Sequence, residues 1–378
     1  MPQIRPVARP AARRPVSPGT GRPSRRRAPV VATVLTAGTL LAATACAPAG
    51  TGPVPAQTVT APPVVAVDKV APPAPVVPPR WPLTGVSADE EPSRPALAVK
   101  IENSREARPQ TGLDQADLVW EEVVEGGITR YLAVFHSQAP AEIGPIRSVR
   151  PMDPAIAAPL HGLMAFSGGQ APFVQALRAS GLQILSNDLG DAGFYRKTGV
   201  APAPHNVYGT PARFWEQADG AHAAPPPAQF SVARSADRAT AVTAGRPATS
   251  LDIVMSGYSH PAWTWDTGSG TWLRSEGSTP ATVRSGARLS AANVVVLRVH
   301  LVDSGTIDPA GNPVPETVLE GTGEGTVVSG GHAVDVTWSK SAVGDPVGLT
   351  AADGTSVTLA PGVTWVELVP DSGSVTVR

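Results

Sequence analysis

Cysteine and aromatic residues are scarce in this sequence. Cys46 is the only cysteine among 378 residues, which excludes an internal disulfide and any cysteine-based zinc or iron–sulfur site. Aromatic residues make up 5% of the chain, whereas it contains 42 prolines and 37 glycines. This composition favours turn-rich folds and at least one linker over a helical bundle. With 42% hydrophobic residues, the chain is still long enough to bury the cores of two ordinary domains.

Acidic residues are absent before Cys46. That segment contains eight arginines, and removing them leaves 22 basic against 31 acidic residues in the remainder. A mature protein with this balance is a poor candidate for general nucleic-acid binding, because such binding relies on many lysine and arginine contacts to phosphates. We therefore predict no nucleic-acid partner.

Residues 1–45 have the form of an export signal. An arginine-rich start is followed by an uncharged run over 28–45 and by small residues before Cys46. We interpret 1–45 as a lipoprotein signal peptide, after which Cys46 is acylated and anchors the protein in the membrane. Ordinary signal cleavage and retention of 28–45 as a membrane span are the alternatives. In each case the remainder is extracytoplasmic, and we predict the outer face of the cytoplasmic membrane. Residues 24–27, S-R-R-R, resemble a twin-arginine export start, so both general and twin-arginine export stay possible.

Composition divides the rest of the chain into a tether and two domains. Residues 46–80 are rich in proline, alanine and valine without periodicity, as in semi-rigid polyproline-like spacers. Residues 81–220 combine strand patterns with proline-initiated helix patterns, which predicts a layered α/β or α+β domain. Its expected strands are 96–101, 117–122, 128–136, 162–166 and 182–185, and its expected helices are 153–160, 171–179 and 211–217.

The C-terminal part is predicted to contain only strands. A change in composition over 221–250 marks a linker to a domain over 251–378. Residues 263–274 alternate apolar and polar residues on both sides of a glycine-containing turn, which predicts a β-hairpin. This pattern is typical of a β-sandwich or barrel whose tryptophans pack the core. Further short strands are expected at 293–302, 325–328, 333–338, 356–359 and 364–368.

Several sequence blocks together resemble one bacterial family. They include A-R-P-Q-T-G-L-D-Q-A-D-L-V-W-E from Ala107, V-E-G-G-I-T-R-Y-L-A-V-F from Val124, I-G-P-I-R-S-V-R-P from Ile143 and P-G-V-T-W-V-E-L-V-P from Pro361. From Trp81 onward the chain is similar over nearly its whole length to the YerB-like lipoproteins, a family of unknown function. The resemblance implies a two-domain protein in the cell envelope, and it implies no reaction.

Arg147 and Arg150 are the leading candidates for ligand binding. They stand three apart on a short segment closed by Pro145 and Pro151. On a strand such residues would face opposite sides, whereas in a loop or helical turn their guanidinium groups could converge. Converging guanidinium groups suit a phosphate or carboxylate, and Arg130 could add a third. The alternative is that each arginine pairs with a nearby acid and only stabilises the domain. The nearby acids are Glu122, Glu125 and Asp153.

Further polar candidates lie near loops. Gly168 and Gly169 follow a predicted strand and precede a predicted helix, where backbone amides can meet an anion. His205 and Asn206 lie in a proline-rich loop, and a fixed histidine could shuttle protons or complete an anion site. Glu122 and His205 are candidate catalytic bases if the protein is an enzyme. Each feature also has a structural interpretation, as a tight turn, a histidine bonded to backbone or a solvated acid.

The motifs leave the reaction class open. The chain has no H-E-x-x-H, P-loop or dinucleotide-binding motif. We predict no cofactor, with a divalent metal bound by carboxylates as the alternative. G-P-I-R from Gly144, followed by S-G-G from Ser167, has a short similarity to the LytR-CpsA-Psr wall-polymer phosphotransferases, without the R-D pair of that family.

These observations favour an envelope lipoprotein that binds an anionic cell-wall component or an envelope partner. Two alternatives stay open. One is a phosphotransferase or hydrolase acting on phosphate-containing wall polymers or lipid-linked precursors, and the other is a structural adaptor for wall-synthesis proteins.

Overall fold

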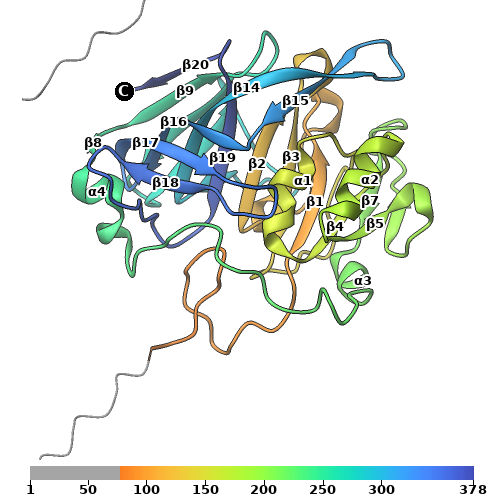
Figure 1. Cartoon of the computed structure of the whole chain (residues 1–378), viewed down its shortest axis with the longest axis horizontal. Coiled ribbons are helices and arrows are strands. Elements are labelled where there is room, and N and C mark those ends of the chain that lie inside the picture. The colour runs from red at the N-terminus through yellow and green to blue at the C-terminus, as the bar shows by residue number, and fades with distance from the viewer. Residues whose placement is uncertain (1–76) are drawn as a thin grey trace, which may run out of the picture. The chain divides into compact units, whose positions relative to one another are not determined.

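The described part of the chain begins at Val77. The computed structural model describes residues 77–378 (Figure 1). The predicted signal peptide over 1–45, the predicted lipidation of Cys46 and nearly all of the predicted tether over 46–80 lie outside these residues. In the described part, strands dominate and helices are few. None of its helices is long and apolar enough to cross a membrane.

A twelve-stranded mixed β-sheet forms the centre of the molecule (Figure 1). Its strands follow the order β18-β17-β16-β14-β19-β2-β3-β1-β4-β5, with β15 paired to β14 and β8 paired to β17. Strands β14, β19, β2, β1, β4 and β5 run in one direction, and β3 runs antiparallel between β2 and β1. The bounds are β1 Leu97–Glu102, β2 Leu118–Val123, β3 Thr129–Phe135, β4 Leu163–Phe166, β5 Gln183–Ser186, β8 Arg246–Pro247, β14 Asn293–Ile307, β15 Pro313–Val318, β16 Gly321–Ser329, β17 His332–Lys340, β18 Gly348–Ala351 and β19 Thr364–Pro370.

The central strands carry apolar residues on both faces because both faces are covered. Every residue of β1, β2, β3 and β19 is buried. Such continuous apolar runs are typical of strands in the interior of a covered sheet. The predicted strands in this region are confirmed to within one or two residues at each end.

Strands from the two halves of the sequence pair directly. β19 lies between β14 and β2 and is parallel to both, with Thr364 opposite Leu118. The regions predicted as N-terminal and C-terminal domains therefore contribute to one sheet, and all described residues belong to one compact unit. The predicted linker over 221–250 contains β8 and helix α4, Thr240–Ala244, and both contact β17.

A second sheet covers one face of the first. Trp263 and Trp272 on this sheet pack in one core with Val119 and Trp365 of the large sheet. The predicted hairpin over 263–274 is confirmed as β10 and β11, and its tryptophans pack the core as expected. The strand order is β12-β11-β10-β9-β20, with β13 paired to β11. The bounds are β9 Ser250–Val254, β10 Pro261–Asp266, β11 Thr271–Glu276, β12 Thr279–Pro280, β13 Ser290–Ala291 and β20 Ser374–Val377.

Helices cover the other face of the large sheet near β1, β3 and β4. Ile156 of helix α1 and Phe173 and Leu177 of helix α2 pack in one core with Trp120 and Leu132 of the sheet. α1, α2 and α3 each have a proline in the first turn, where the missing N–H costs nothing, and α3 packs through Phe214 in the core that the second sheet shares. The bounds are α1 Asp153–Ala157, α2 Ala171–Ala179 and α3 Pro211–Trp215.

Two helix predictions were too long, and one strand prediction was wrong. A 3₁₀ turn replaces the predicted helix over 158–160, and the helix predicted over 211–217 ends at Trp215. Residues 356–359 form no strand, because their two ends bridge different partners, Thr350 and Val232. β14 and β15 form a long ribbon whose residues 300–318 were not fully predicted, since largely exposed strands lack a clear apolar period. β6, Phe194–Arg196, and β7, Val207–Gly209, form a small separate pair.

Candidate functional site

The candidate site lies at the carboxyl ends of the parallel strands. β1 and β4 pair only as far as Val99 and Ala165 and then separate. The segment over 145–149 enters between them, because the N–H of Arg147 donates to Lys100 O on β1 (2.8 Å) while Arg147 O accepts from the N–H of Ser167 after β4 (3.0 Å). Diverging carboxyl ends of this kind are where open α/β sheets bind ligands.

Arg130 occupies the middle of this edge on β3. Glu102 on β1 and Glu122 on β2 are its register partners, so the three side chains share one face of the sheet. The Arg130 Nη1 donates to Ser148 O at 2.7 Å, and its Nη2 lies 3.9 Å from Glu125 Oε2. The guanidinium is almost completely buried.

Arg147 and Arg150 converge on the same face as Arg130. The Arg147 Nε lies 3.3 Å from Glu102 Oε1, and the Arg150 Nε forms an ion pair with Glu125. We call these three arginines, with Glu102 and Glu125, the arginine cluster. The irregular backbone between Pro145 and Pro151 produces this convergence, which a regular strand would not allow.

Positive charge exceeds negative charge in the arginine cluster, which holds three guanidinium groups and two carboxylates. Burial lowers the pKa of Arg130 to about 9, and repulsion from Arg150 and then Arg147 contributes, with Glu125 opposing. Among the described residues, the Arg130 Nε has no partner and the Arg147 Nη groups donate no hydrogen bond, whereas the Nε atoms of Arg147 and Arg150 face carboxylates as ion pairs. Guanidinium groups with unused donors in one place form an environment that an added anion would stabilise.

His205 also reaches the arginine cluster. Its Nδ1 lies 2.7 Å from Glu102 Oε1, the same oxygen that accepts from Ser104 Oγ at 3.1 Å. The side chains of Arg147 and His205 are 21% and 23% exposed, whereas those of Arg130 and Arg150 are nearly buried. The surface of the cluster is therefore formed by Arg147 and His205.

The other predicted loop residues lie at the margin of the cluster. The Asn206 Oδ1 accepts a hydrogen bond from Arg196 Nη1 at 2.9 Å, which ties this oxygen to the end of β6. A Cβ on Gly168 would lie 1.9 Å from Asp188 Oδ2, and one on Gly169 would lie 2.6 Å from Val149 Cγ2. Close packing explains why both positions are glycine. Gly169 is exposed beside the segment that carries Arg147 and Arg150.

Glu122, the other candidate base, lies beneath the cluster. Its Oε1 accepts from Lys100 Nζ, which also donates to Asp153 Oδ1 at 2.7 Å, and all three side chains are fully buried. Burial raises the pKa of Glu122 to about 7, with Asp153 adding to the rise and Lys100 opposing it. Proton transfer at physiological pH is chemically possible for this carboxyl, although its side chain does not reach solvent in the structure.

Sequence reasoning missed the roles of Lys100 and Glu102. Both stand in the strand A-L-A-V-K-I-E, two residues apart and therefore on one face. Two opposite charges on the same face of an otherwise apolar, buried strand are a signal of internal pairing, because an unpaired buried charge is very costly.

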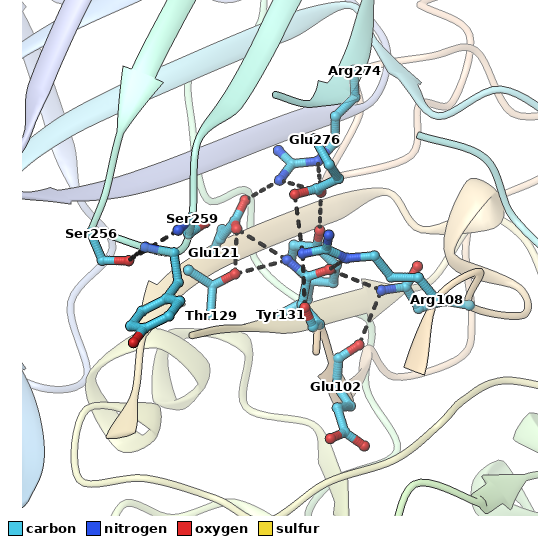
Figure 2. A network of polar contacts seen from close by, with 12 residues as sticks. Glu102, Arg108, Glu121, Thr129, Tyr131, Ser256, Ser259, Arg274 and Glu276 are labelled. Carbon is cyan, nitrogen blue, oxygen red and sulfur yellow. Dashed lines mark hydrogen bonds and ion pairs between the residues drawn. The ribbon is translucent and has the colours of Figure 1, made fainter. Parts of the chain in front are cut away.

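A second buried polar cluster lies on the opposite face of the same strands. The Arg274 guanidinium is fully buried and contacts three carboxylates, as Figure 2 shows for Glu121 and Glu276. Its Nη1 donates to Glu367 Oε1 at 2.8 Å. These residues come from β11, β2 and β19, so this cluster connects the two sheets. No group of three or more histidine, cysteine, aspartate or glutamate side chains within residues 77–378 is placed to hold a metal ion.

Comparisons with known proteins match nearly the whole described part. The family model described as the protein of unknown function (DUF3048) N-terminal domain matches residues 83–224, and that for the DUF3048 C-terminal domain matches 251–366. The chain is 25% identical over 300 residues to "Putative lipoprotein YerB" of Bacillus subtilis (strain 168), covering 77% of this chain and 86% of that protein.

A solved structure is also similar. The crystal structure of YerB protein from Bacillus subtilis matches with a TM-score of 0.66 and 23% identity, over 79% of this chain and 99% of that chain. This likeness shows that the two chains share a fold.

Proposed function

Because this chain belongs to the DUF3048 family of YerB-like proteins, whose function is unknown, we propose a role from its own residues: an envelope lipoprotein that binds an anionic wall component through its arginine cluster. The name of the Bacillus subtilis relative supports the lipoprotein part. So does the pattern of an arginine-rich start, an apolar run and a single Cys46. In this proposal, acylated Cys46 anchors an α/β-layered N-terminal region and a β-rich C-terminal region at the outer face of the cytoplasmic membrane.

The excess of guanidinium groups over carboxylates carries the binding proposal. Three arginines share two carboxylates at the carboxyl edge of the sheet, and within residues 77–378 the Arg130 Nε and the Arg147 Nη groups have no hydrogen-bond partner. A planar guanidinium fork matches the oxygens of a phosphate or carboxylate. An incoming anion would complete the pairing that the protein alone leaves incomplete.

Arg147 is the residue that would meet this anion. It is the most exposed of the three arginines, and its only acidic partner among the described residues is Glu102. Because the same Glu102 oxygen also accepts from Ser104 and contacts His205, it can release Arg147 without losing all its partners. Arg130 and Arg150 would contribute mainly through the electrostatic field from below.

Replacing Arg147 with alanine is expected to weaken anion binding by about 10-fold to 100-fold, since a hydrogen bond to a charged group contributes about 1.5–3 kcal/mol. The measurement is calorimetric titration of the full-length protein with pyrophosphate and with a phosphate-containing wall polymer. Glu102→Gln should bind both probes more tightly, because it removes the competing carboxylate.

Arg178→Ala provides the matched control, because Arg178 is an exposed arginine on α2 that belongs to no cluster described above. Its affinity should equal that of the wild type. Saturable binding that is unchanged in Arg147→Ala, or no saturable binding at all, would contradict the proposal and favour the adaptor hypothesis.

The contact between His205 and Glu102 favours phosphoryl transfer or hydrolysis as the second candidate function. A carboxylate that holds a partly exposed histidine through Nδ1 leaves Nε2 available as a general base. Under this alternative, the full-length protein should convert lipid-linked wall precursors, assayed with and without divalent metal. Turnover should be abolished in His205→Ala and retained in Asn206→Ala. No product in any condition would exclude this function for the tested precursors.

A further inference from the structure

A separate hollow lies on the other face of the same strand ends. It has a volume of about 650 Å³, within the usual range for small-molecule sites. Arg130 and its neighbour Tyr131 point to opposite faces of β3, and the Tyr131 hydroxyl donates to Glu276 Oε1 at 3.1 Å. Since Glu276 lines the hollow, the arginine cluster and the hollow lie on opposite faces. The polar residues that line the hollow are Arg105, Arg108, Gln110, Tyr258, His260 and Glu276.

One wall of the hollow is cationic and partly fixed in position. The Arg108 Nε donates to Asn103 Oδ1 and its Nη2 to Asn103 O, both at 2.9 Å, while Nη2 lies 3.1 Å from Glu276 Oε2 (Figure 2). The Arg108 side chain is 29% exposed. Arg105 is exposed and its side chain forms no hydrogen bond or ion pair with any residue from 77 to 378. A pre-oriented guanidinium beside a free one is suited to a carboxylate or phosphate.

An aromatic side chain stands at the rim. Tyr258 is 78% exposed, and its backbone N–H and that of Ser259 both donate to Ser256 Oγ at 3.0 Å. The Ser256 hydroxyl in turn donates to Gly127 O at the β2–β3 turn. A Cβ on Gly127 would lie 3.2 Å from Tyr258 Cδ2, so the glycine leaves room for the ring. The turn therefore presents the aromatic ring of Tyr258 to solvent.

Hydrogen-bonding and apolar groups complete the hollow. Gln110 Nε2 donates to Glu102 O at 3.0 Å and to Asn103 Oδ1 at 3.1 Å, which fixes the position of its amide. His260 is exposed, and its ring has no hydrogen-bond partner in the described part of the chain. Pro109, Pro280 and Leu289 add apolar surface to the same hollow. The site thus combines cations, groups that can bond hydroxyls, and one exposed aromatic face.

We propose that this hollow binds an acidic sugar, a pyranose that carries a carboxylate or a phosphate. The C–H face of the sugar ring would pack on Tyr258, an amphipathic ring that presents apolar surface to a ligand. Its acidic group would pair with Arg105 and Arg108, and its hydroxyls would bond Gln110, His260 and Glu276. This site does not depend on the proposed function of the arginine cluster, because the two share no side chain.

The test is calorimetric titration of the full-length protein with glucuronic acid oligosaccharide, glucose 6-phosphate, neutral glucose oligosaccharide and a nucleoside monophosphate. The two acidic sugars should bind saturably, and the neutral sugar should bind at least about 10-fold more weakly. Arg105→Ala and Tyr258→Ala should each weaken binding of the acidic sugars by about 10-fold. Both side chains are exposed, so the thermal transition should stay at the wild-type temperature.

Arg178→Ala is the matched control, and it should bind acidic sugars as the wild type does. Tyr258→Ala separates this site from the arginine cluster, because it should weaken binding of the acidic sugars and leave pyrophosphate binding unchanged. No saturable binding of either acidic sugar would overturn the proposal. So would tighter binding of the nucleotide than of the sugar phosphate, or wild-type affinity in both Arg105→Ala and Tyr258→Ala.

Discussion

Replacing Arg274 with methionine is expected to lower the free energy of unfolding by about 3–5 kcal/mol, the cost of removing one partner from a buried ion pair. Arg274 is fully buried and contacts Glu121, Glu276 and Glu367. Methionine would fill part of the space of the side chain but leave these carboxylates without their central cation. The measurement is urea denaturation at neutral pH.

The environment of Arg274 makes this effect large. Its guanidinium carbon lies 4.6 Å from the Trp365 ring centroid and 5.4 Å from that of Trp263, so aromatic faces replace much of its lost hydration. Burial raises the pKa of Glu121 well above its ordinary value, Arg274 opposes the rise, and Glu367 and Glu276 add to it. Glu121 thus retains its proton to a higher pH than an exposed glutamate, and removal of the cation would strengthen that tendency.

Two further variants test whether the loss of stability in Arg274→Met comes from the unpaired buried acids. Arg246→Met removes an exposed arginine that pairs with exposed Asp335, and it should cost less than about 1 kcal/mol. Adding Glu121→Gln to Arg274→Met should recover part of the lost stability, because a neutral amide replaces one unpaired acid. A loss in Arg274→Met no greater than in Arg246→Met would show that the buried cluster around Arg274 does not stabilise the fold.

Replacing Lys100 with methionine should also destabilise the protein by about 3–5 kcal/mol at pH 8. Lys100 is the shared cation of two fully buried acids, Glu122 and Asp153. Without it, the two carboxyls face each other in a medium that solvates neither charge. The loss should be smaller at pH 5, since protonation of Glu122 removes one of the unpaired charges.

The stability of the wild-type protein should also depend on pH through the titration of Glu122. The pKa of Glu122 is raised to about 7 by burial, from an ordinary value of 4.5. Between these values the folded state holds a proton that the unfolded chain has released, so stability falls as pH rises through this window. The contribution of Glu122 is roughly 3 kcal/mol over the whole window. Denaturation curves from pH 4 to pH 8 measure it.

Glu122→Gln is the control for this pH dependence. It removes the titrating group and keeps an oxygen that can accept from Lys100, so its stability should vary less between pH 4.5 and 7 than that of the wild type. The free energies of unfolding of Lys100→Met and the wild type should differ more at pH 8 than at pH 5. An equal difference at the two pH values would show that Glu122 does not titrate between them.

Local patterns in the sequence predicted most central elements. The apolar runs over 96–101 and 128–136 form β1 and β3, and the proline at the start of 171–179 marks helix α2. These signals are local, because strand and helix periods and helix caps are set by neighbouring residues. The convergence of Arg147 and Arg150 was one of two possibilities left open by the same local reasoning, and the non-regular backbone between two prolines decided it.

The pairing between distant segments could not be predicted. Nothing near Leu118 indicates that Thr364 lies beside it, because both strands are simply apolar runs. The same holds for the Arg274 cluster, whose acids Glu121 and Glu367 belong to separate predicted domains. A charge in a buried strand shows that a partner exists, and only the fold shows which one.

The position of β19 has a consequence for how the chain folds. β19 ends at Pro370 and yet fills the middle of the large sheet, between β2 and β14. Until the chain has been made as far as Pro370, β2 keeps an unpaired edge that can pair with another copy. Contacts between such distant segments also slow folding. We therefore expect the first half alone to aggregate, and the large sheet to close only when the segment through Pro370 is present.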